Sequence, residues 1–221
     1  PAKSEAAEDT AGPAPKAEFA VVYPEGAFGR STPPQPPEIL LIQGATVWTC
    51  GPEGILSPGD VLVKGGKVAQ VGRNLTAPAG AVVVNAAGKH VTPGLIDAHS
   101  HVAIRGGVNE STHAVASETR IEDVIDSDDI NIYRQLAGGL TTACILHGSA
   151  NPIGGTYAVL KLKWGALPEE MLIRDAMPGL KLALGENVKR STERYPDTRM
   201  GTVEIIRDAF LAARDYRRQW Q

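Results

Sequence analysis

Two histidines separated by a single residue are the part of this sequence best suited to chemistry. His99 and His101 follow an apolar run, and side chains at i and i+2 of a β-strand project from the same face. Two neutral imidazoles on one strand can hold a divalent ion, with zinc–nitrogen distances of about 2.0–2.1 Å. The alternative is a pair of exposed polar side chains. Asp97, on the same strand face, is predicted to orient an imidazole.

Three other histidines are weaker candidates. His147 ends an apolar segment, where it is predicted to contact substrate or polarise a carbonyl, although a hydrogen-bonded structural role explains it equally well. His90 precedes the histidine pair and is expected to be structural. His113 reaches a site only if its loop folds inward.

Short β-runs come before the histidine pair. A two-residue turn is predicted at Gly65-Gly66, because primed hairpin turns need positive φ at both positions. The segment before these runs differs, since residues 1–37 hold 8 of the 16 prolines and are expected to be extended. The predicted strands are Ile39–Ile42, Ala45–Thr49, Val61–Lys64, Lys67–Val71 and Ala81–Val84.

Strand and helix patterns alternate from Gly94 onward, which favours a parallel sheet covered by helices. We predict a helix over Asp129–Leu136, a strand over Thr141–Leu146 and an amphipathic helix over 201–221. The connection from His101 to Asp128 then becomes a long loop at the carboxyl ends of the strands, where barrels place their chemistry.

The string Pro-Gly-Leu-Ile-Asp-Ala-His-Ser-His over 93–101 resembles the first barrel strand of the metal-dependent amidohydrolase superfamily. Later strings are similar to the imidazolonepropionase-like branch of bacterial amidohydrolases, and the resemblance covers residues 38–221. Those strings are Leu-Ala-Gly-Gly-Leu-Thr-Thr from Leu136, His-Gly-Ser-Ala-Asn-Pro-Ile-Gly-Gly from His147, Ala-Leu-Gly-Glu-Asn-Val-Lys-Arg from Ala183 and Thr-Arg-Met-Gly from Thr198.

The resemblance implies an α/β fold, an incomplete (β/α)8 TIM-type barrel preceded by part of a small β-sandwich. The expected divisions are an extended Pro/Ala-rich segment over 1–37, the sandwich part over 38–92 and the barrel part over 93–221. A complete barrel needs roughly 200–250 residues. We therefore expect an N-terminal part that is inactive alone, whose partner is the remainder of its own chain, and whose general-base aspartate lies beyond Gln221.

The chemistry implied is hydrolysis of non-peptide carbon–nitrogen bonds of a small-molecule substrate, with one or two divalent ions, zinc first among them, activating a water. His99 and His101 would be metal ligands. Glu186, at the end of an apolar strand, is the favoured middle-strand ligand. A carbamylated lysine is the alternative, offered by Lys181, Lys161 or Lys163. The competing interpretation is a non-catalytic relative that keeps the fold as a binding or assembly module.

Composition limits the remaining classes. The chain is 43% hydrophobic and 21% charged with a net charge of −3, which gives no basic field for nucleic acid, and its apolar runs are too short for a transmembrane helix. Cys50 and Cys144 are predicted to be two buried thiols rather than a disulfide. A homo-oligomer is compatible with this sequence, and so is a cytoplasmic or a periplasmic or secreted location.

Overall fold

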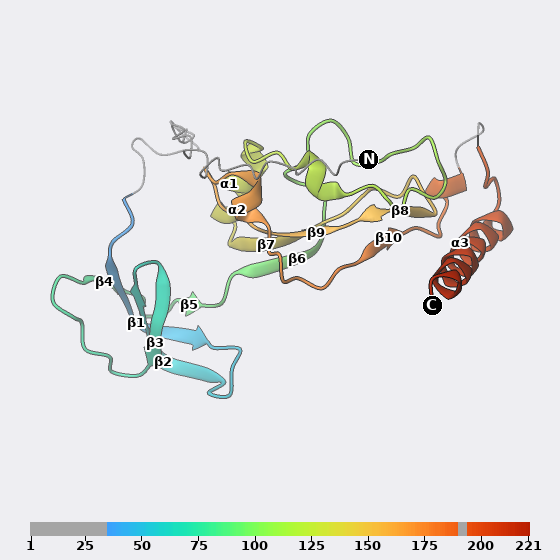
Figure 1. Ribbon diagram of the computed structural model, residues 1–221. Helices are drawn as coiled ribbons and strands as arrows, with labels where there is room; N and C mark the ends of the chain where they lie inside the picture. Colours follow the sequence, from blue (N-terminus) through green and yellow to red (C-terminus); the bar gives the residue numbers. More distant parts are fainter. Residues whose placement is uncertain (1–34, 190–193) are drawn as a thin grey trace, which may run out of the picture. The chain divides into compact units, whose positions relative to one another are not determined.

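The computed structural model describes residues 35–189 and 194–221 (Figure 1). The chain divides into two units, Pro1–Pro34 and Gln35–Gln221, and every helix and strand described below belongs to the second. Most of the predicted extended segment, residues 1–37, therefore lies outside the described residues.

A five-stranded mixed sheet forms the first part of the described chain. Its order is β3-β2-β1-β4, and β5 also pairs with β1. The neighbours β1–β2 and β2–β3 are antiparallel, whereas β4 and β5 run parallel to β1. The bounds are β1 Ile39–Trp48, β2 Ile55–Lys64, β3 Lys67–Gly72, β4 Val82–Asn85 and β5 His90–Val91.

Local sequence signals explain how this sheet turns. The predicted Gly65-Gly66 hairpin is confirmed: both glycines have positive φ, 52° and 72°, and Lys64 pairs with Lys67 across the turn. The carboxylate of Asp60 is buried and accepts the amides of Gly44 and Leu75, each at 2.8 Å. This side chain therefore ties β2 to the irregular part of β1 and to the loop after β3.

The second part of the chain carries a three-stranded sheet of order β6-β7-β9 and a two-stranded sheet of β8 and β10. Helix α1 follows the long loop after β6 and begins at the N-cap Asp129. The bounds are β6 Leu95–Ser100, η1 Ile121–Val124, α1 Ile130–Ala137, β7 Leu140–Ile145, β8 Ile153–Thr156, β9 Ala158–Lys161, α2 Pro168–Met171, β10 Leu180–Leu182, η2 Asn187–Lys189 and α3 Arg199–Gln219.

Aliphatic side chains from α1, β7 and β9 build the main core of this part. Ile132, Ile145 and Leu160 are fully buried, and Met171 of α2 packs into the same cluster. Because β6 and β7 are parallel, their carboxyl ends meet at one edge of the sheet. That edge carries the histidine pair.

The predicted all-parallel sheet is correct only for β6 and β7, since β9 runs antiparallel to β7. Parallel neighbours need a long crossover that usually contains a helix. The connection between β7 and β9 is described throughout and contains the strand β8 but no helix. The chain therefore returns along β7 in the opposite direction.

Both cysteines are free, but the prediction that both are buried is wrong for Cys50. This residue is exposed because it lies in the turn between β1 and β2 with φ of 53°, whereas Cys144 is half-buried on β7. The predicted amphipathic helix is present as α3. Within the described residues, no helix combines the length and apolar character needed to cross a membrane.

Candidate metal centre

The histidine pair lies at the carboxyl end of β6. His99 is in the strand and His101 directly follows it, and both side chains are exposed. Their ring centroids are 5.3 Å apart, with the ring planes nearly perpendicular at 87°. The two imidazoles are therefore neighbours on one side of the strand end, as the spacing predicts.

A backbone carbonyl just after the adjacent strand fixes the tautomer of the His101 ring. Nδ1 of His101 lies 2.8 Å from the carbonyl oxygen of Leu146, just after β7. A carbonyl can only accept, so Nδ1 carries the proton and Nε2 keeps its lone pair. This is the arrangement by which a neighbouring acceptor selects the tautomer of a metal-binding histidine.

Asp97 acts on the pair by a different route from the one expected. Its Oδ1 accepts the backbone amide of His99 at 3.0 Å. The sequence predicted a hydrogen bond to an imidazole, whereas the structure shows one to the main chain. Asp97 therefore holds the strand end that presents His99.

Lys181 of β10 brings a cationic side chain to the pair, with Nζ at 3.4 Å from Nε2 of His99. The same lysine and Asp97 act in opposite senses on Cys144. Burial and then the Asp97 carboxylate raise the pKa of the Cys144 thiol, and Lys181 lowers it. Side chains from β6, β7 and β10 thus share one polar region beside the histidines.

Glu186 is placed elsewhere. Its carboxylate pairs with Nζ of Lys189 at 2.6 Å and with Nη2 of Arg199 at 2.8 Å. Hydrogen bonds from these two cations lower the pKa of Glu186 to about 2. Within residues 35–189 and 194–221, no group of three or more His, Cys, Asp or Glu side chains is arranged to hold a metal. The structure therefore does not bring the favoured middle ligand to the histidine pair.

His147 is buried, with 5% of its surface exposed. Burial lowers the pKa of its imidazole and so favours the neutral form. Its Nε2 is covered and has no hydrogen-bond partner in the described part of the chain. Gly155 makes room for this ring, because a Cβ there would overlap Nε2 of His147 and the carbonyl oxygen of Thr119. The predicted substrate contact is therefore closed to that nitrogen in this conformation.

The loop after the histidine pair is hydrogen-bonded along β8. The amide of Ala116 donates to the carbonyl of Ile153, and the amide of Thr156 donates to that of Thr119, both at 2.9 Å. Asn151 is buried and its side-chain amide donates to the carbonyls of Glu110 and His113. His113 thus helps to hold this loop through its backbone carbonyl.

Comparison with known proteins gives consistent similarities. No family model matches the chain. "Amidohydrolase tasK" of Hapsidospora irregularis is 31% identical over 209 residues, which is 78% of this chain and 21% of that protein. A dihydroorotase of Geobacter sulfurreducens is 51% identical over 63 residues, 28% of this chain and 15% of the relative. An imidazolonepropionase of Mycolicibacterium smegmatis is 38% identical over 79 residues, 36% of this chain and 20% of the relative.

One solved structure shares the fold over most of the described residues. A crystal structure of an amidohydrolase from Thermotoga maritima MSB8 superposes with a TM-score of 0.71 at 38% identity, covering 81% of this chain and 49% of that one. This chain therefore spans about half of that structure and about a fifth of the Hapsidospora protein.

The mixed α/β fold matches that of a solved amidohydrolase and fits the predicted incomplete TIM-type barrel. The relatives and the solved structure that this chain resembles are members of the amidohydrolase superfamily.

Proposed function

We propose that this chain provides the first metal ligands of a hydrolase that cleaves carbon–nitrogen bonds other than peptide bonds. The relatives support the reaction class, since they include an amidohydrolase, a dihydroorotase and an imidazolonepropionase. The observation that carries the proposal is the approach of Lys181 to His99, beside a His101 whose Nε2 is left free for a ligand.

The donor set suits a zinc-like divalent ion. Neutral imidazole nitrogen is a preferred zinc ligand, and the Leu146 carbonyl already selects the tautomer of His101 that can bind through Nε2. When bound, such an ion would lower the pKa of a coordinated water and polarise the scissile carbonyl. The protein's part is to hold the two imidazoles on the rigid end of β6, with Asp97 fixing the backbone.

Lys181 replaces Glu186 as our middle ligand. A neutral lysine amine adds carbon dioxide by forming an N–C bond and releasing one proton, which leaves a carbamate anion on the side chain. A carbamate at Lys181 would supply anionic oxygen next to His99. Glu186 cannot do so here, because Lys189 and Arg199 occupy its carboxylate.

Metal content of the dialysed protein, measured by elemental analysis after loading with zinc and bicarbonate, tests the proposal. We expect retained zinc in the unmodified chain and in His90→Ala, a control because His90 bonds instead to Trp48. Zinc should be lost in His101→Ala. Equal zinc in the unmodified chain and in His101→Ala would overturn the assignment.

The role of Lys181 is tested separately with isotopically labelled bicarbonate. Lys181→Met should abolish the carbamate carbon-13 signal, whereas Lys161→Met, on exposed β9 surface, should keep it. Absence of the signal from the unmodified zinc-loaded protein would mean that another side chain is the middle ligand. Turnover of cyclic amides by the zinc-loaded protein would exclude the non-catalytic module.

A further inference from the structure

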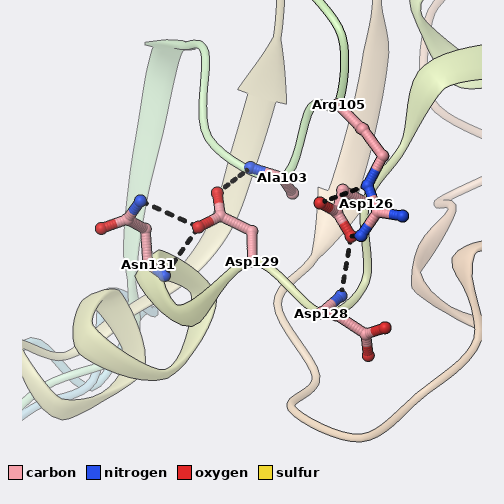
Figure 2. Close-up of polar contacts among 6 residues, drawn as sticks. All are labelled: Ala103, Arg105, Asp126, Asp128, Asp129 and Asn131. Atoms are coloured by element: carbon pink, nitrogen blue, oxygen red, sulfur yellow. Dashed lines mark hydrogen bonds and ion pairs between the residues drawn. The ribbon is translucent and has the colours of Figure 1, made fainter.

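Beyond His101 the chain makes a sharp turn that is held by one carboxylate. Ala103 is completely buried and has φ of 58°, a backbone conformation that non-glycine residues rarely adopt. Oδ2 of Asp129 accepts the amide of Ala103 at 2.7 Å (Figure 2). The loop therefore leaves the histidine pair in one fixed direction.

The same carboxylate also begins helix α1. Oδ1 of Asp129 accepts the backbone amide of Asn131 at 2.9 Å, which is the N-cap interaction of that helix. The side-chain amide of Asn131 donates to this oxygen as well, at 2.8 Å. As Figure 2 shows, Asp129 lies between the start of α1 and the backbone turn at Ala103.

A short ladder next to this contact strengthens the turn. The carbonyl of Ala103 accepts the amide of Asp126 at 2.8 Å, and the amide of Arg105 donates to the carbonyl of Val124 at 3.0 Å. The Arg105 guanidinium makes two hydrogen bonds of 3.1 Å to the Asp126 carboxylate. These contacts fix residues 103–105, and the Asp129 carboxylate hydrogen-bonds the turn to the start of the helix.

We propose that Asp129 is a positioning residue for His101, linking the start of α1 to the segment that carries the ring. This inference rests on the proposed function, because His101 is taken as a metal ligand. His101 is held on two sides: the Leu146 carbonyl fixes its ring, and Asp129 fixes the backbone two residues further on. Loss of the second contact lets the ring rotate away from Leu146.

Asp129→Ser separates the two functions of the side chain. Serine is a good N-cap and can still accept the Asn131 amide, but it is too short to bridge to Ala103 as well. Two controls are matched to it. Asp126→Asn weakens the Arg105 pair while keeping the backbone bond to Ala103, and Thr198→Ala removes the cap of α3 without touching the loop.

The first measurement is the tautomer of His101 in the metal-free chain, read from the nitrogen-15 shifts of its ring. In Asp129→Ser we expect the Nδ1–H form to give way to a mixture, together with faster exchange of the Ala103 amide. Both controls should keep the shifts of the unmodified protein. An unchanged tautomer and an equally protected Ala103 amide in Asp129→Ser would overturn the proposal.

The second measurement is the dissociation constant for cobalt(II), followed by its visible absorption. Changes around metal-binding histidines typically cost about 10- to 100-fold in affinity, and we expect about tenfold for Asp129→Ser with less than about twofold for the controls. Equal affinity in Asp129→Ser would refute the role. If the unmodified chain binds no cobalt, the proposed function fails, and the tautomer measurement still decides on Asp129. Should Asp129→Ser fail to fold, Asp129→Asn, which leaves one acceptor oxygen for two amides, takes its place with the same criteria.

Discussion

Replacing Gly155 by alanine is expected to destabilise the contact between β8 and the loop that follows the histidine pair. Gly155 is buried, and a Cβ there would overlap three atoms: the carbonyl oxygen and Oγ1 of Thr119, and Nε2 of His147. The Thr119 carbonyl is backbone and already accepts the amide of Thr156 at 2.9 Å. It cannot withdraw without breaking that bond.

The magnitude follows from three contributions. Overpacking a buried site costs about 1–3 kcal/mol, and a broken buried hydrogen bond costs about 1–3 kcal/mol. The lower chain entropy of alanine in the unfolded state offsets about 0.4–1 kcal/mol of this destabilisation. The midpoints of these ranges give an expected net loss of about 3.3 kcal/mol in the free energy of unfolding, or roughly 270-fold in the equilibrium constant.

Urea unfolding of the variant, followed by far-ultraviolet circular dichroism, measures this loss. Gly185→Ala is the matched control, because within the described residues, its two chain neighbours aside, no atom lies within 4 Å of its Cβ position. It should stay within about 0.5 kcal/mol of the unmodified protein. If Gly155→Ala were as stable as Gly185→Ala, the close approach of Thr119 and His147 to Gly155 would be incorrect.

Three further predictions follow from buried or paired side chains. Because burial lowers the pKa of His147, the imidazole takes up a proton in the unfolded chain before it does so in the folded chain as pH falls below about 6.5. The free energy of unfolding should therefore decrease as pH falls through this range. His147→Gln should reduce the difference in the free energy of unfolding between pH 7.5 and pH 5.5, measured by urea titration. Asp60→Asn leaves an amide of Gly44 or Leu75 without an acceptor and should cost about 1–3 kcal/mol, with faster hydrogen exchange at one of them; unchanged exchange at both would contradict the assignment. Glu186→Gln should leave zinc content unchanged, since that carboxylate pairs with Lys189 and Arg199, and a loss of zinc would restore it as a ligand.

Local patterns were sufficient for the elements that present the histidine pair. The i, i+2 spacing of His99 and His101 after an apolar run placed both rings on one side of a strand end, and Asp129 before an apolar periodic segment marked the start of α1. Gly65-Gly66 fixed the hairpin because the turn needs positive φ at both residues. The role of His99 and His101 as metal ligands remains a prediction.

Contacts between distant segments were not predictable in this way. Glu186 was expected at a strand end, but β10 stops at Leu182, and the following turn carries the carboxylate to the cations of η2 and α3. His147 was expected at a strand end, either contacting substrate or in a hydrogen-bonded structural role, whereas the loop around Thr119 covers it through a close approach to Gly155. Both outcomes depend on tertiary packing, which the local sequence does not specify. Asp129 was predicted as the first residue of a helix, but its bond to Ala103 spans 26 residues.

Strand β6 is an edge strand of its sheet within the described residues, with Leu95 and Ile96 exposed by 58% and 71%. Its unpaired side belongs to the same strand that carries His99. Under the proposed function, metal binding at the strand end and pairing along the strand edge would be two equilibria of one backbone segment. If a strand added to β6 changed the metal affinity by some factor, the metal would have to change the affinity for that strand by the same factor. The open edge beside the proposed ligands would then couple assembly of the sheet to metal concentration.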